Sequence, residues 1–248
     1  MIAFISDLHA NLESLKAFLD RSKSQGVSRI YCLGDVVGYG PDPDKCIQIL
    51  RKLNIPVVRG NHDHYASSEE SLGAFNLEAL NSLIWTRNNI KKINKKWLQS
   101  LPYSLVCNID DFIQLFLSHS NVNELSGWPY INDVDAAEQE LRKCPTQFNF
   151  IGHTHKPAIY SLNANGCVLH ELIEDQEILL DMNSKWLVNV GSLGQPRDRK
   201  TSASYVVYDE TNHSITLKRI NYNYRKTVLK ISKKGLPEKN GIRLTAGI

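Results

Sequence analysis

The sequence predicts an α/β protein with two β-sheets in a single domain covering residues 1–248. Its first third alternates short apolar runs with amphipathic segments, which indicates strands and helices joined by short links and therefore a largely parallel sheet. After about residue 158, short strand-like runs separated by turn residues are typical of antiparallel sheet. We expect this second sheet to pack on the first, because nothing between the halves resembles a flexible linker.

The first strand is predicted from a run of apolar residues, and the first helix from a residue that can cap its N-terminus. Residues 2–5 are apolar without alternation, which is typical of a strand buried on both faces. Asn11 is expected to cap a helix that has Glu13 in its first turn and ends near Gly26.

Two further strands complete the predicted parallel unit. Residues 29–33 form the second, and Asp42 and Pro43 are expected to start the helix that follows it. The β-branched run at 57–59 is expected to form the third strand, which would end in a sharp turn at Gly60.

Residues 64–102 interrupt this rhythm and are interpreted as a helical insertion, either a buttress or a lid over a site. Apolar residues between Leu72 and Leu83 recur at three to four positions, which predicts a long helix. A second, short helix is expected to begin near Asn94 and end before Pro102.

The rest of the chain is predicted to be rich in strands. One helix is expected at 136–143, and the tail from Arg225 is expected to be weakly helical at best. The expected strands are residues 104–107, 113–118, 148–151, 158–162, 168–171, 178–182, 187–190, 204–208 and 214–220.

Composition indicates an ordered globular protein and gives no sign of a nucleic-acid partner or a membrane helix. Hydrophobic residues make up 42% of the chain and charged residues 22%, as in ordered globular proteins. The net charge of +3 is too small to indicate a nucleic-acid partner, and we interpret the basic clusters at 91–96 and 225–234 as solvated surfaces. No apolar run approaches the length of about 18–20 residues that a membrane helix needs.

The five cysteines are odd in number and widely spaced, and no two of them form a CxxC pair. This pattern is typical of reduced thiols and not of a disulfide framework or a zinc site. We therefore expect a cytoplasmic protein.

Five turns share one property: each follows a predicted strand and carries side chains able to bind metal. They are Asp7-Leu8-His9, Gly34-Asp35, Gly60-Asn61-His62-Asp63, His119 and Gly152-His153-Thr154-His155. If the turns are extended, residues two apart point to one side, so Asp7 with His9, and His153 with His155, could each hold one ion. Carboxylate and imidazole without thiolate suit Mn, Fe, Zn, Ni or Co. Seven ligands exceed the needs of one tetrahedral ion, which favours two divalent ions.

In this order, the five motifs resemble those of the calcineurin-like metallophosphoesterase superfamily. Further segments resemble a phosphodiesterase branch that includes YfcE-type and diadenosine tetraphosphatase-related proteins. These segments are Gly38-Tyr39-Gly40-Pro41, Asn189-Val190-Gly191-Ser192 and Gln195-Pro196-Arg197-Asp198. The resemblance implies two facing mixed β-sheets, a β-sandwich, flanked by helices in four layers.

The resemblance also implies a role for each motif residue. Asp7, His9 and His155 would hold the first metal, Asn61, His119 and His153 the second, and Asp35 would bridge both. His62 matches the catalytic imidazole of the family, with Asp63 as the carboxylate that orients it. One departure is Ser120, which stands where many relatives have Gly.

Other residues are assigned with less support from motifs. Arg59, Tyr39 and Arg197 are candidates to bind substrate, with a structural ion pair or a packed ring as the alternative for each. His64, His170 and His213 fall outside the motifs and are interpreted as structural.

We therefore expect a dinuclear metal-dependent phosphoesterase that hydrolyses phosphodiesters or nucleotide-like small molecules, dinucleoside polyphosphates included. The resemblance implies attack by a hydroxide held between the metals, with His62 as general acid. A phosphomonoesterase or protein phosphatase is the alternative within this chemistry. A non-catalytic protein-binding scaffold is the alternative outside it, but such a scaffold would be expected to lose His62 or several ligands. The sequence leaves homo-oligomerisation open.

Overall fold

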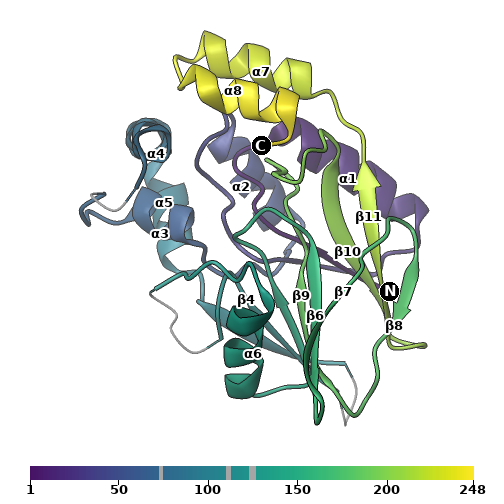
Figure 1. The fold of residues 1–248 in the computed structure, drawn as a ribbon. Coiled ribbons are helices and arrows are strands. Elements are labelled where there is room, and N and C mark those ends of the chain that lie inside the picture. Colours follow the sequence, from purple (N-terminus) through teal and green to yellow (C-terminus); the bar gives the residue numbers. More distant parts are fainter. Residues whose placement is uncertain (73–74, 110–112, 123–126) are drawn as a thin grey trace.

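Two mixed β-sheets face each other, and helices cover their outer faces, in a computed structural model that describes residues 1–72, 75–109, 113–122 and 127–248 (Figure 1). The core between the sheets includes Phe4 of one sheet and Phe150 of the other, whose rings stack 4.1 Å apart. Neighbouring Ala3 and Ile5 point the opposite way, into a second core under the helices, as the two-residue period of a strand requires. The four layers and the mixed sheets confirm the expected fold class.

The first sheet has the strand order β2-β1-β10-β11-β8. Its strands are β1 (Ile2–Ile5), β2 (Arg29–Cys32), β8 (Glu177–Leu179), β10 (Ala203–Asp209) and β11 (Ser214–Ile220). Strands β1 and β2 pair in parallel, and β10 pairs antiparallel with β1. This pairing corrects the expectation that each half of the chain forms its own sheet, since β10 and β11 return from the second half to complete the first sheet.

The second sheet has the strand order β3-β4-β5-β9-β6-β7. Its strands are β3 (Ser104–Asn108), β4 (Gln114–Ser118), β5 (Phe148–Ile151), β6 (Ala158–Asn163), β7 (Gly166–His170) and β9 (Lys185–Asn189). Strands β4, β5 and β9 run parallel, so their carboxyl ends meet at one edge of the sheet.

The helices surround these sheets. They are α1 (Leu12–Ser24), α2 (Pro43–Lys52), α3 (Asn61–Ser67), α4 (Leu77–Asn89), α5 (Lys92–Gln99), α6 (Val134–Lys143), α7 (Tyr224–Lys233) and α8 (Glu238–Ala246). The expected cap of α1 is confirmed, because the Asn11 side chain accepts a hydrogen bond from the backbone of Ser14. No helix in the described residues is long and apolar enough to cross a membrane.

Two expectations for the first half of the chain are wrong. The expected strand at 57–59 is reduced to one bridge between Val57 and Cys32, because Pro56 has no N–H and the amide of Arg59 donates to Pro102. The helix expected from Leu72 begins only at Leu77. Positions 73 and 74 of the expected insertion lie outside the described residues.

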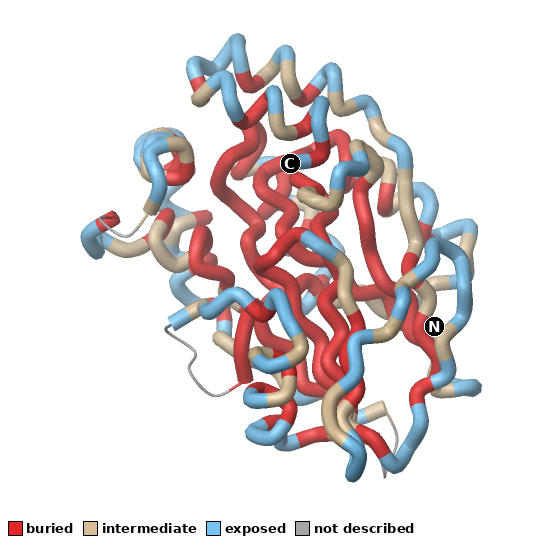
Figure 2. Tube along the Cα trace, viewed as in Figure 1, coloured by how far each residue is buried: buried red, intermediate tan, exposed pale blue. Residues whose placement is uncertain are grey.

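The C-terminal tail corrects a further expectation, because it forms two helices, α7 and α8, where at most weak helicity was expected. They pack as a hairpin with exposed outer faces at one end of the molecule, whereas the buried chain runs through both sheets (Figures 1 and 2). Ile231, Leu236 and Leu244 form a small apolar cluster between them. Tertiary packing of this kind stabilises helices whose isolated sequence is a weak helix former.

Candidate metal centre

The predicted ligands converge at the carboxyl ends of the strands. Three buried groups have ligand atoms within 4.8 Å of one another: Asp7 with His9 and His155; Asp35 with His119 and His153; and His9 with Asp35 and His62. Asn61 joins the second group, because its Oδ1 lies 3.2 Å from His119 Nε2. All seven predicted ligands and His62 therefore lie together.

The loops that carry these ligands hold a rarely used backbone conformation. Five of the ligands have positive φ, which is uncommon for residues other than glycine. They are Asp7 (52°), His9 (45°), Asp35 (52°), His153 (69°) and His155 (61°). Strain of this kind is concentrated at functional sites, where the surrounding structure must hold it.

The left-handed turns also correct one spatial expectation. Asp7 and His9 do share a group, but His153 and His155 belong to different groups. Residues two apart point to one side only in an extended chain, and both of these histidines depart from that conformation.

Three of the histidines are held in one tautomer by backbone carbonyls. The Nδ1 atoms of His9, His119 and His155 lie 2.9, 2.7 and 2.6 Å from the carbonyl oxygens of Val37, Leu33 and Gln195. Because a carbonyl oxygen can only accept, each Nδ1 carries the proton, and in a neutral ring the Nε2 presents a lone pair. Metal-ligating histidines are typically oriented in this way. Burial would lower the pKa of His119, but the nearby Asp35 raises it to about 9, so a cation that binds His119 Nε2 must displace a proton.

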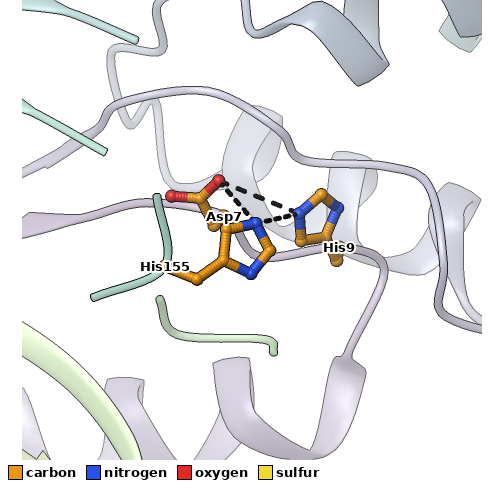
Figure 3. Close-up of side chains that lie close together, drawn as sticks. All are labelled: Asp7, His9 and His155. Atoms are coloured by element: carbon orange, nitrogen blue, oxygen red, sulfur yellow. Dashed lines mark hydrogen bonds and ion pairs between the residues drawn. The ribbon is translucent and has the colours of Figure 1, made fainter. Parts of the chain in front are cut away.

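The first group brings two such lone pairs together. His9 Nε2 and His155 Nε2 lie 3.1 Å apart, and Asp7 Oδ1 lies 3.2 Å from the latter (Figure 3). Asp7 Oδ1 is buried and accepts no hydrogen bond from the residues that the structure describes. Two lone pairs and a carboxylate oxygen repel one another without a cation between them, so this group fits a metal ion.

The second group repeats the arrangement, and Asp35 joins the two groups. His119 Nε2 lies 3.1 Å from His153 Nδ1. Asp35 Oδ2 lies 3.4 Å from His119 Nε2 and 3.6 Å from His9 Nε2, so one carboxylate oxygen faces both groups.

The carboxylates of the two groups are held in their charged form. Burial would raise the pKa of Asp35, but the nearby His119 and His62 outweigh it and hold the pKa well below its usual range. Burial likewise opposes ionisation of Asp7, and His155 lowers its pKa. Burial lowers the pKa of His153 to about 3, so that this imidazole is neutral at pH 7.

His62 lies at the start of α3, beside the first group. The expected turn at 60–63 is in fact the N-terminus of this helix. Burial lowers the pKa of His62 to about 4, against the opposing effect of Asp35. The Nδ1 atom of His62 has no hydrogen-bond partner in the described part of the chain.

Asp63 does not orient His62, which corrects the role that the family resemblance implied. Its two carboxylate oxygens accept hydrogen bonds from the backbone N–H groups of Gly60 and Val37, both at 3.1 Å. Burial and the nearby Asp35 raise the pKa of Asp63 to about 7. Asp63 therefore ties the start of α3 to the loop that carries Asp35.

A glycine is needed at position 60 because Asp35 approaches closely, and not because of the backbone conformation. The φ of −90° at Gly60 is open to any residue. A Cβ at this position would overlap the Asp35 carboxylate, with Cγ only 2.8 Å away. The glycine therefore lets α3 approach the bridging aspartate.

The remaining predicted residues divide into two sets. Tyr39 and Arg197 lie at the site, since the Tyr39 ring is 4.6 Å from that of His62 and the Arg197 guanidinium is 5.6 Å from the Tyr39 ring. Arg59 instead lies over the Tyr103 ring and donates to the carbonyl of Gln99, which are structural contacts.

The three histidines outside the motifs make structural hydrogen bonds, as expected from the sequence, and Ser120 leaves His119 in place. His64, His170 and His213 are hydrogen-bonded to Glu70, Ser161 and Tyr208, outside all three ligand groups. Ser120 is buried, and His119 keeps its place among the ligands.

Tyr130 at the site was not predicted. Its ring stacks on that of His153 with centroids 4.2 Å apart, although half of the residue is exposed. No local pattern marks this tyrosine, because its contact depends on a loop that meets β5 only in the folded chain.

Residues 1–213 match the model of the calcineurin-like phosphoesterase superfamily domain. The chain belongs to this family. It is therefore a metallophosphoesterase, and the family's dependence on metal agrees with the ligand groups described above.

Similar proteins span the whole length of this metallophosphoesterase. An uncharacterized protein from Methanocaldococcus jannaschii is 41% identical over 252 residues, covering 100% of this chain and 98% of its own. A metallophosphoesterase from Sphaerobacter thermophilus has a crystal structure with a TM-score of 0.83 and 31% identity, covering 100% and 98% of the two chains. A hypothetical protein from Pyrococcus horikoshii shares the fold, with a TM-score of 0.80 at 19% identity, over 100% and 99% of the chains.

Proposed function

We propose that this metallophosphoesterase holds two divalent cations and hydrolyses phosphodiesters or nucleotide-like small molecules. The observation that carries the proposal is the pair of ligand groups joined by Asp35, whose Oδ2 faces both His9 and His119. Asp7, His9 and His155 would hold one cation, and Asn61, His119 and His153 the other.

The chemistry of the donors limits the choice of cation. The two groups offer imidazole, carboxylate and amide donors, and their residues include no cysteine. Such donors suit Mn, Fe, Zn, Ni or Co. When bound, two such cations neutralise phosphoryl oxygens and lower the pKa of water from 15.7 towards about 7.

His62 would supply the proton that the leaving group needs. Its imidazole is buried beside both ligand groups, and without substrate burial keeps it neutral at pH 7. A bound phosphate would bring a negative charge next to the ring and so favour its protonated form. His62 would then donate its proton to the departing alkoxide oxygen.

Tyr39 and Arg197 would bind the substrate at the edge of this site. Arg197 is close enough to lower the pKa values of His62 and His155, so it adds positive charge where an anionic substrate must bind. Arg59 is assigned a structural role, because its guanidinium is engaged by Tyr103 and Gln99.

The five cysteines are free, which supports action in the reducing cytoplasm. We infer this location from the thiols alone.

The test is hydrolysis of bis-p-nitrophenyl phosphate, p-nitrophenyl phosphate and diadenosine tetraphosphate after loading with Mn, Zn, Ni or Co. We expect the wild type to cleave the diester faster than the monoester, and Asp35→Asn to lose activity on both. His213→Ala, which lies outside the ligand groups, is the matched control. Preference for the monoester would favour the phosphomonoesterase alternative, and a metal-loaded protein inert towards every substrate would refute the proposal.

A further inference from the structure

Tyr39 contacts two histidines of the site and has two arginines near its ring. Its ring lies 4.8 Å from that of His9 and 4.6 Å from that of His62. The guanidinium carbons of Arg197 and Arg243 lie 5.6 and 5.7 Å from the centre of the same ring. Two positive charges therefore lie near the ring that contacts both His9 and His62.

Neither arginine has a carboxylate partner among the described residues. Arg197 donates hydrogen bonds to the amide oxygen of Gln195, at 2.9 Å from Nη2. Arg243 is half-buried, and its Nη1 is fully buried with no hydrogen-bond partner within the described ranges. Glu78 lies near Arg243 but forms its ion pair with Lys239, at 2.6 Å.

Contact with the Tyr39 ring does not compensate the positive charges of the two arginines. A cation–π contact is weak at exposed sites and satisfies none of the N–H groups of a guanidinium. A buried donor left without an acceptor is costly, so such donors normally have a partner. An anionic ligand would supply the counter-charge that both guanidiniums lack among the described residues.

The position of Arg243 is fixed by its helix. Asn240, one turn earlier on α8, is buried and donates to the carbonyl oxygen of Tyr39 at 2.9 Å and to Ser82 Oγ at 2.8 Å. Leu244 lines a small cavity together with His9 and Tyr39, so α8 packs directly behind the site. Helix α8 also lies beyond residue 213, where the match to the family domain ends.

We propose that Arg197 and Arg243 bind a second phosphate group of the substrate, next to the phosphate that is cleaved. The planar fork of a guanidinium matches the oxygens of a phosphate, and such charge-assisted hydrogen bonds are about twice as strong as neutral ones. The substrate class is then a phosphodiester of a nucleotide that carries a further phosphate. This inference rests on the proposed function, and it makes the C-terminal hairpin a specificity element.

The test uses two substrates that differ by one phosphate. They are the p-nitrophenyl ester of thymidine 5′-monophosphate and the same ester with an added 3′-phosphate. We expect the wild type to prefer the second, and Arg243→Ala to lower the ratio of the two kcat/KM values about 10–100-fold, as the loss of a hydrogen bond to a charged group predicts. Arg243→Lys, which keeps the charge but not the fork, should restore part of the ratio.

Arg225→Ala is the matched control, because Arg225 lies on the same hairpin and is exposed. It should leave both kcat/KM values unchanged. The inference is overturned if the wild type shows no preference, or if Arg243→Ala changes both substrates equally or neither. Equal unfolding temperatures of the variants would show that the hairpin is still folded.

Binding separates failure of this inference from failure of the proposed function. If the wild type cleaves neither ester, the proposed function fails, and calorimetry with thymidine 3′,5′-bisphosphate and 5′-monophosphate decides the inference. At least 10-fold tighter binding of the bisphosphate by the wild type, lost in Arg243→Ala but not in Arg225→Ala, would support it. Equal binding of the two nucleotides would overturn it.

Discussion

The Nε2 atoms of His9 and His155 lie 3.1 Å apart in the interior, while the Nδ1 atom of each ring donates to a backbone carbonyl. Both Nε2 atoms therefore present lone pairs to the same point. Water is excluded there, since both residues are almost fully buried. A cation between them removes the repulsion, so metal binding should stabilise the folded chain.

Metal should therefore raise the unfolding temperature of protein stripped with a chelator. A ligand at 100 times its Kd stabilises by about 2.7 kcal/mol, which for a chain of this size is about 5–10 °C. Thermal scans with added Mn²⁺ or Zn²⁺ measure the shift. It should be smaller in His155→Ala and unchanged in His213→Ala, whereas no shift with any divalent metal would contradict the metal sites.

Gly60→Ala should displace the bridging aspartate. The new Cβ would overlap the Asp35 carboxylate, so α3 or the loop carrying Asp35 must move. We expect a loss of metal affinity together with a destabilisation of about 1–3 kcal/mol, the usual cost of overpacking.

Gly235→Ala is the matched control for this substitution. It adds a methyl group in open space at a φ of +69°, and it should lower the free energy of unfolding without affecting metal. Metal titrations and urea unfolding of both variants make the comparison. Equal metal affinity of Gly60→Ala and the wild type would show that the close approach of α3 is not required.

His62→Ala should reduce kcat without loss of metal. Removal of a general acid typically costs about 10²–10⁴ in rate. His64→Ala, on the same helix but hydrogen-bonded to Glu70 and Tyr103, should retain most of its activity. Rates on bis-p-nitrophenyl phosphate and elemental analysis give the two readouts, and a fully active His62→Ala enzyme would rule out the acid role.

Lys230→Met should destabilise the attachment of the C-terminal hairpin. Lys230 Nζ lies 2.7 Å from a Glu13 oxygen and 2.6 Å from an Asp42 oxygen, and both carboxylates are largely buried. We expect a loss of about 1–3 kcal/mol in the free energy of unfolding, as for a broken hydrogen bond to a charged group.

This loss should depend on pH. Burial alone would raise the pKa of Asp42, but Lys230, with Lys234 and Lys45, lowers it below its usual value of 3.8. The stabilisation is therefore present above about pH 4 and disappears as the pH falls below it. Urea unfolding of wild type and variant from pH 3 to 7 measures the difference, and a difference that grows at low pH would contradict this assignment.

The convergence of the ligands could be predicted from the sequence because it follows from strand ends. Asp7 and Asp35 come just after β1 and β2 of the first sheet, and His119 and His153 come just after β4 and β5 of the second. Parallel strands of one sheet deliver such residues to a common edge, and the two sheets face each other. Each motif is short and local, and the occurrence of all five in order carries the resemblance to the family.

The missed features depend on partners distant in the chain. Asp63 is engaged by the backbone of Val37, which no spacing reveals, so the expected pairing with His62 was wrong. The helices of the tail depend on packing between α7 and α8, and Arg243 reaches Tyr39 only because α8 lies against the site. Sequence periodicity carries little information about such contacts.

The most direct measurement of the metal centre is anomalous diffraction from a crystal grown with Mn²⁺. Two peaks are predicted, one among Asp7, His9 and His155 and one among Asn61, His119 and His153, with the Asp35 carboxylate between them. A single peak, or peaks outside these two groups, would contradict a two-metal phosphoesterase.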